Sequence, residues 1–94
     1  MKIHFSGADD EFLNFNVLTI SEDEFVSNRL FSLQSTLEYI FKIEPRSHKS
    51  FFKADGTLAN GTICLIDEVD ASIKEEEELK SDSDIVLIST MHGG

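Results

Sequence analysis

Alternating apolar and polar positions predict strands near the start of the chain. Residues 2–6 place Ile3 and Phe5 on one side and polar residues on the other, a pattern typical of a half-buried strand. Residues 12–20 alternate in the same way, but the pattern shifts by one position near Val17. A bulge or bend is expected there, so residues 1–20 are interpreted as a hairpin.

One segment has helical periodicity. Apolar residues recur at intervals of three and four between positions 30 and 41, which predicts an amphipathic helix. Ser27 is expected to cap its start. The helix should end near Ile43, because Pro45 disfavours helical geometry at the residue before it. The acidic residues 21–24 are interpreted as a linker.

Three more strands are predicted after the helix. Residues 50–54 suggest a short strand, and residues 62–66 form a continuous apolar run that we expect to be covered on both faces. Turn signals containing glycine lie between them at 55–56 and 60–61. The last predicted strand is residues 85–89.

This order of elements predicts an α+β fold in which a mixed sheet has one main helix packed on one face. A right-handed crossover through the helix would make the first and last strands parallel neighbours at the centre of the sheet. That arrangement is the ubiquitin-like β-grasp. We expect residues 1–88 to form this single domain and residues 89–94 to form an exposed tail.

The tail ends in two glycines. Glycine has no Cβ atom, so its backbone can enter a narrow channel and approach a ligand closely, and the carboxylate of Gly94 is left unhindered. Fully extended, residues 89–94 reach at most about 20 Å. The tail could therefore extend from the domain into the nucleotide site of a partner.

Composition narrows the class of partner. The 94 residues carry 18 acidic and 8 basic side chains, a formal net charge of -10. This charge argues against direct contact with nucleic acid or an anionic membrane and favours a partner with a basic docking face. The longest apolar run is four residues, so no membrane span is expected. The single Cys64 fits a reducing compartment, and a cytoplasmic location, with access to the nucleus as the alternative, is predicted.

No set of residues suggests catalysis or metal binding by the chain itself. There is no nucleophile with its base, no phosphate loop and no Cys/His cluster, so the chain is predicted not to be an enzyme. Cys64 lies within an apolar strand and is expected in the core. His4 and His48 are isolated and are expected to be surface residues or locally satisfied. The acidic residues 67–70 lack the glycine and acid spacing of a calcium loop.

The phenylalanines are assigned first to the core. An exposed apolar patch used by partners is the alternative for one or two of them. The residues concerned are Phe31, Phe41, Phe51 and Phe52.

Three segments resemble one known family. Residues 61–70 resemble its glycine followed by a strand that ends on Leu-Ile-Asn-Asp-x-Asp, and residues 79–84 match its Leu-x-x-Asp-x-Asp. Residues 88–94, Ile-Ser-Thr-Met-His-Gly-Gly, are similar to its Ser-Thr-Leu-His-Gly-Gly ending. The family is the ubiquitin-related modifiers, which are ubiquitin-like sulfur carriers. Over residues 1–60 the resemblance rests on element order, Gly7 and the helix.

The resemblance implies a carrier. An activating enzyme of the ubiquitin-activating type, with a rhodanese domain, would adenylate the carboxylate of Gly94 using ATP and magnesium. A persulfide would then convert it to a thiocarboxylate. The sulfur would pass to the wobble uridine of tRNA through a thiolase complex, and the same activated end would be joined to lysines of target proteins. Thr90, Met91, His92 and Gly93 are expected to be recognised by the activating enzyme. Assistance to the acyl chemistry is the alternative for His92, and an exposed tail residue without a contact is the alternative for Met91.

Two other functions remain open at this point. One is a sulfur carrier of the molybdopterin or thiamine type, which shares the fold and the diglycine end. The other is a ubiquitin-like binding module whose end is never activated. Whichever of these functions applies, we expect the chain to bind no cofactor itself and to act as a monomer.

Overall fold

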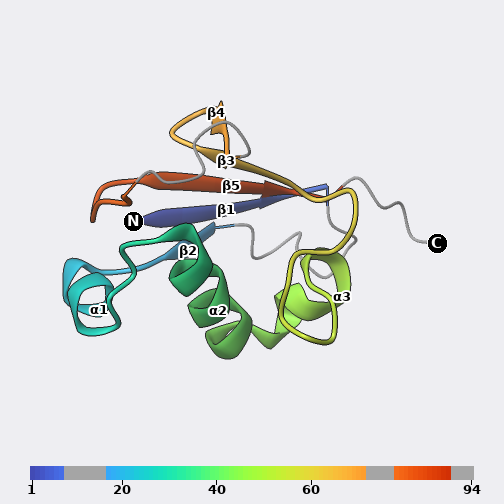
Figure 1. The fold of residues 1–94 in the computed structure, drawn as a ribbon, viewed down its shortest axis with the longest axis horizontal. Coiled ribbons are helices and arrows are strands. Elements are labelled where there is room, and N and C mark those ends of the chain that lie inside the picture. Colours follow the sequence, from blue (N-terminus) through green and yellow to red (C-terminus); the bar gives the residue numbers. More distant parts are fainter. Residues whose placement is uncertain (8–16, 72–77, 90–94) are drawn as a thin grey trace.

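The computed structural model describes residues 1–7, 17–71 and 78–89, without the side chain of Lys49. A five-stranded mixed sheet forms one layer, and helices cover one of its faces (Figure 1). The strand order is β2-β1-β5-β3-β4. The strands are β1 (Lys2–Ser6), β2 (Val17–Thr19), β3 (Ile63–Ile66), β4 (Val69–Asp70) and β5 (Asp84–Ile88). The helices are α1 (Glu22–Ser27), α2 (Leu33–Ile43), the 3-10 turn η2 (Pro45–Ser47) and α3 (His48–Phe51).

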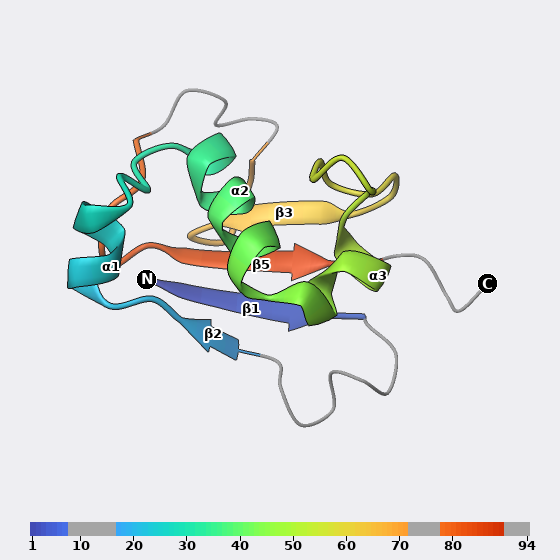
Figure 2. The same ribbon diagram turned by 90° about the horizontal axis from the view of Figure 1, so that it is seen from below.

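The first and last strands form the centre of the sheet. β1 and β5 run parallel, with Lys2 opposite Asp84 and Ser6 opposite Ile88. β2 and β3 flank this pair, each antiparallel to its neighbour. α2 lies across the face of the sheet that the helices cover (Figure 2). This arrangement confirms the predicted mixed sheet, its single main helix and its central parallel pair. A crossover through the helical layer makes such a pair possible, because parallel neighbours cannot be joined by a tight turn.

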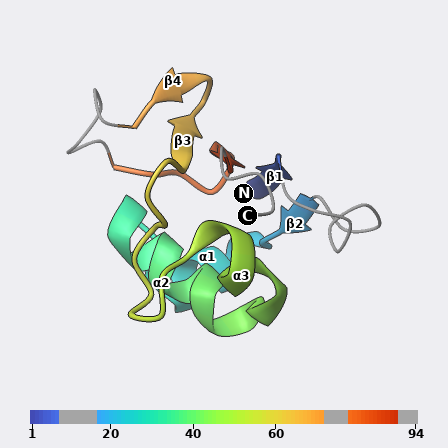
Figure 3. The same cartoon turned by 90° about the vertical axis from the view of Figure 1, so that its right-hand side faces the viewer.

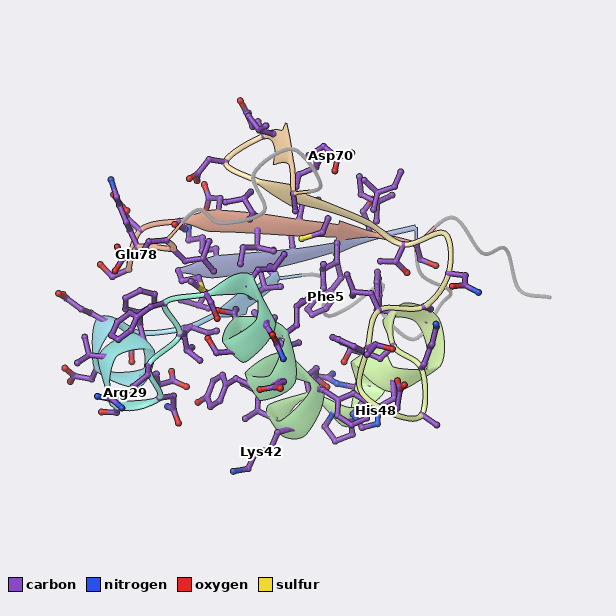
Figure 4. All side chains as sticks on the ribbon, in the orientation of Figure 1. Phe5, Arg29, Lys42, His48, Asp70 and Glu78 are labelled. Carbon is purple, nitrogen blue, oxygen red and sulfur yellow. The ribbon has the colours of Figure 1, made fainter. Side chains whose placement is uncertain are left out.

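The core lies between the sheet and the helices. Ile3, Phe5 and Leu87 point from the central strands into it and are at most 5% exposed. Ile40 of α2 meets them from the other layer and is fully buried. The ring of Phe5 lies 5.1 Å from that of Phe51, and Figure 4 places Phe5 between the layers. Burying each such side chain contributes about 1.5–3 kcal/mol, so the central strands are held firmly.

The main helix begins later than predicted, a second short helix forms where a linker was expected, and the assigned N-cap was wrong. α1 begins after Ser21, whose side chain accepts from the backbone N–H of Glu24, so the supposed linker is the start of a helix. α2 begins only after its N-cap, Ser32. The side chain of Ser32 accepts from the backbone N–H of Ser35, and the side chain of Ser35 accepts from the backbone N–H of Ser32. Each pair satisfies backbone N–H groups that a helix start leaves free. Ser27 ends α1 and caps nothing.

The chain reverses at Arg29, which has a left-handed backbone with φ of 54°. Leu30 after it is nearly fully buried. Leu30 is apolar because it packs in the core. It matches the apolar spacing of the predicted helix although it lies outside both helices. Pro45 does end α2, as predicted, with Glu44 as the C-cap.

The strand predicted at 50–54 is not formed. Residues up to Phe51 belong to α3, and Phe52 makes only an isolated bridge to Leu58. Both phenylalanines are buried. A helical turn places Phe51 beneath Phe5, so tertiary packing overrides the strand preference of adjacent aromatic residues.

β3 is covered on one face only, contrary to the prediction. Cys64 and Ile66 are buried, whereas Ile63 is 40% exposed on the opposite face. The strand continues through a tight turn at Asp67 and Glu68, both with positive φ, into β4. This hairpin lies at the far edge of the sheet (Figure 3). Its turn residues supply the left-handed geometry that two-residue hairpins require.

The structure describes only the last part of the second predicted strand, as β2 (Val17–Thr19). β2 pairs with β1 without interruption from Val17 to Thr19, so no bulge occurs between these residues. Leu18 and Ile20 do face the core as a set. The remainder of the predicted strand, residues 12–16, lies outside the described residues. Among the helices that the structure describes, none has the length and apolar character to cross a membrane.

Candidate functional site: the root of the carboxyl-terminal segment

Ser89 follows the central strand β5 and is held in place. Its backbone N–H donates to the carbonyl oxygen of Ser6 at 2.8 Å, which extends the β1–β5 ladder by one bond. Ser89 is only 4% exposed. The last described residue, Ser89, is therefore both buried and hydrogen-bonded at the end of the central strand pair.

Gly7 makes this close approach possible. Its φ is +78°, in the left-handed region that favours glycine. A Cβ atom at position 7 would overlap the carbonyl oxygen of Ser89. The absent side chain is the space that the backbone of Ser89 occupies, so the sequence needs glycine here for two independent reasons.

In the sequence, Gly7 stands out only as one point of family resemblance. The signal for its contact with Ser89 was indirect. A glycine directly after the first strand lies, in a parallel β1–β5 pair, beside the residue directly after the last strand. This neighbourhood follows from the register of β1 and β5, which hydrophobic periodicity does not specify.

The predicted reactive and recognition residues lie outside the described residues. They are Thr90, Met91, His92, Gly93 and Gly94. The structure describes only the point from which they start. At that point the hydroxyl Oγ of Ser89 is buried and has no hydrogen-bond partner among the described residues.

Cys64 lies in the core, as predicted, and its surroundings make it unreactive. It is 7% exposed. Burial, together with the charge of Asp70, raises the pKa of the Cys64 thiol to about 11. Since the thiolate is the reactive form, this side chain is unsuited to accept sulfur or an acyl group.

His4 and His48, the two histidines within the described residues, make local contacts. The ring of His48 stacks on that of Phe41, with centroids 3.9 Å apart (Figure 4). Its Nε2 also lies at hydrogen-bond distance from the carbonyl oxygen of Phe41. His4 is part-exposed, and its Nε2 is 4.0 Å from Oδ1 of Asp84. No group of three or more potential ligands gathers within the described ranges.

The phenylalanines are divided between core and surface. Phe51 and Phe52 are buried. Phe31 is 39% exposed, with its ring edge against Phe25. Phe41 is half-buried on α2. The core assignment is therefore confirmed for Phe51 and Phe52, whereas Phe41 is only half-buried and Phe31 is exposed, contrary to that assignment. Use of Phe31 by a partner stays a prediction.

A mixed sheet with central parallel β1 and β5, one main helix on one face and a chain end leaving from the centre defines a ubiquitin-like β-grasp protein. The family model described as Urm1 (ubiquitin related modifier) matches residues 1–94. The chain belongs to the ubiquitin-related modifier family, as the resemblance of its ending predicted.

Individual relatives agree with this assignment. Ubiquitin-related modifier 1 of Encephalitozoon cuniculi is 36% identical over 96 residues, covering all of both chains. The protein of the same name from Schizosaccharomyces pombe is 34% identical and covers 94% of this chain and 91% of its own. A crystal structure of Sulfolobus solfataricus Urm1 superposes with a TM-score of 0.62 over 95% of this chain and 99% of that one. At 19% identity, this last likeness shows the fold alone.

Proposed function

We propose that this chain is a sulfur carrier whose Gly94 carboxylate is adenylated by a partner enzyme and converted to a thiocarboxylate. Membership of the ubiquitin-related modifier family supports the proposal. So does the ending Ser-Thr-Met-His-Gly-Gly, which presents an unhindered carboxylate after two residues without side chains. The proposed contacts of the activating enzyme are Thr90, Met91, His92 and Gly93.

One observation carries the proposal. Ser89 is fixed between Ser6 and Gly7 at the end of the central strand. The five residues after it, fully extended, span at most about 18 Å. A rigid root of this kind fixes where a short segment can reach. A partner that docks on the body therefore finds the carboxylate within a limited volume, which raises its effective concentration at the nucleotide.

The proposed chemistry needs no catalytic group on the carrier. A carboxylate oxygen of Gly94 attacks the α-phosphorus of ATP, held with magnesium by the enzyme, and pyrophosphate leaves. The terminal sulfur of an enzyme persulfide then attacks the acyl carbon, and AMP leaves. Breaking the sulfur–sulfur bond by a thiol of the enzyme releases the thiocarboxylate and leaves a disulfide there. The carrier contributes docking and presentation and is not an enzyme.

Two uses of the activated end follow in this proposal. The thiocarboxylate delivers sulfur to the wobble uridine of tRNA through a thiolase complex that itself binds the nucleic acid. The activated acyl group is also joined to lysines of target proteins through an isopeptide bond. Both uses place the chain in the cytoplasm, with access to the nucleus as the alternative. The strongly acidic composition, with a net charge of -10, suits protein partners rather than direct contact with RNA.

A complementation experiment tests the proposal. Cells that lack their own carrier would receive either the full chain or a chain without Gly94, and 2-thiouridine in their tRNA would be measured. The full chain should restore thiolation and the shortened chain should not. Failure of a well-expressed full chain would contradict the tRNA role and favour the molybdopterin or thiamine type. Equal rescue by both chains would indicate a binding module whose end is never activated.

A further inference from the structure

The helical face of the molecule carries an open groove of about 520 Å³ that the proposed function does not use. Its apolar lining comes from α2 and from the loop between α3 and β3. Residues at helical spacing on α2, among them Leu37 and Phe41, form one wall, and Leu58 forms the other. Leu33 and Ala71 extend it into a second hollow of about 440 Å³ beside β3. None of these residues belongs to β1 or β5.

The loop wall is held in place without a ligand. Oδ1 of Asp55 accepts hydrogen bonds from the backbone N–H and the hydroxyl of Thr57, at 3.0 and 2.7 Å. Gly56, with φ of +90°, lies against the ring of Phe41. Phe41 is in turn fixed by stacking on His48. A preformed apolar groove lowers the ordering cost of binding.

The charged side chains that line the groove are acidic. Glu38 and Asp55 stand at its two walls, and its described lining includes no lysine or arginine. Lys42 and Lys53 lie outside the lining. Lys42 points away from the body (Figure 4), whereas the positive charge of Lys53 acts on the carboxylate of Asp55. The lining itself is negatively charged, which favours a positively charged occupant.

We propose that this groove binds an amphipathic segment of a partner protein that places apolar side chains against Leu37, Phe41 and Leu58 and basic side chains beside Glu38 and Asp55. A helix with apolar residues at i, i+3 or i+4 and i+7 has the spacing that an open groove of this kind accepts. A second copy of this chain is disfavoured, because each copy carries a net charge of -10.

The inference is independent of the proposed activation of Gly94, since binding in the groove needs neither ATP nor the tail. The probes are two synthetic helical peptides with the same leucine face, one flanked by lysines and one by glutamates. Each is titrated into the isotope-labelled full chain while backbone amide shifts are followed by NMR. The lysine peptide should bind about tenfold more tightly and should shift amides of α2 and of residues 55–58.

Matched variants separate the groove from the overall charge. Glu38→Lys combined with Asp55→Asn should abolish the preference for the lysine peptide, while the Asn side chain keeps an acceptor for Thr57. Glu78→Lys combined with Asp82→Asn changes the net charge equally on exposed residues outside the lining and should keep the preference. Ala71→Trp, which fills the junction of the two hollows, should weaken binding of the lysine peptide.

Three results would overturn the inference. One is an equal loss of preference in both pairs of variants, which would assign binding to the general field of the chain. Another is a set of amide shifts confined to the outer face of the sheet. The third is that neither peptide binds the folded chain.

Discussion

Gly7 packs directly against the carbonyl group of Ser89, with no room for a side chain at position 7. This contact joins the residue after the first strand to the residue after the last one. It fixes the start of the carboxyl-terminal segment by the shape of the backbone alone. The carboxyl-terminal segment therefore starts from a defined position on the sheet.

Gly7→Ala should therefore destabilise the fold by at least about 2 kcal/mol, from left-handed strain plus the overlap with Ser89. Gly56→Ala is a matched control. Its φ of +90° imposes similar strain, but a Cβ there would meet the ring of Phe41 at an ordinary 3.5 Å, so it should cost only about 1 kcal/mol. Urea unfolding of both variants measures the difference. Equal costs would show that the contact with Ser89 does not constrain position 7.

The helix caps give a second prediction. Ser32→Ala removes the side chain that accepts from the backbone N–H of Ser35 and should cost about 1 kcal/mol of unfolding free energy. Ser27→Ala, at the exposed end of α1, should change stability by less than about 0.5 kcal/mol. Denaturation of the two variants compares them directly. The reverse order would mean that one continuous helix begins at Ser27.

The hydroxyl of Tyr39 donates to Oε2 of Glu24 at 2.7 Å and links α2 to α1. This bond is the largest of the effects that lower the pKa of the Glu24 carboxyl below its ordinary value. A group whose pKa is lower in the folded state than in the unfolded state stabilises the fold at pH values above its unfolded-state pKa. This stabilisation is lost as the pH falls through the folded-state pKa. Tyr39→Phe should therefore cost about 0.5–1 kcal/mol near pH 7, a modest figure because both groups reach solvent.

The same reasoning fixes the pH dependence of the Tyr39→Phe effect. The stability difference between the two proteins should be constant well above pH 4.5 and should shrink as the solution is acidified below it. Thermal unfolding at a series of pH values follows this difference. A difference that stays constant into strong acid would exclude the carboxylate of Glu24 as the partner.

Cys64 should behave as a packing residue. Burial, together with Asp70, raises its pKa to about 11, so much less of the thiol is ionised near neutral pH than in an exposed cysteine. Alkylation by iodoacetamide should therefore be at least about tenfold slower in the folded chain than in urea. Cys64→Ala should still accept sulfur at Gly94. Loss of sulfur acceptance in a folded Cys64→Ala chain would give the thiol a direct part in the chemistry.

The sequence predicted the features that follow from strong periodicity. The alternation at Ile3 and Phe5 and the apolar run before Ser89 identified the two central strands. Their order around a helix predicted their parallel pairing. The family resemblance of the ending was confirmed by the family model.

What failed were features decided by tertiary contacts. Leu30 fits a helical period but is buried in the connection between two helices. Phe51 fits a strand but is placed by its ring contact with Phe5. The contact between Gly7 and Ser89 depends on the register of β1 and β5, which the sequence pattern does not specify. Neither neighbouring residues nor periodicity carry this information.

The central claim is tested most directly by the intact mass of the chain after incubation with the activating enzyme, ATP, magnesium and a sulfur donor. The account predicts a mass gain equal to the exchange of one oxygen for one sulfur, assigned by fragmentation to the carboxylate of Gly94 and absent when ATP is omitted. An unchanged mass, under conditions in which a related carrier is fully converted by the same enzyme, would contradict it.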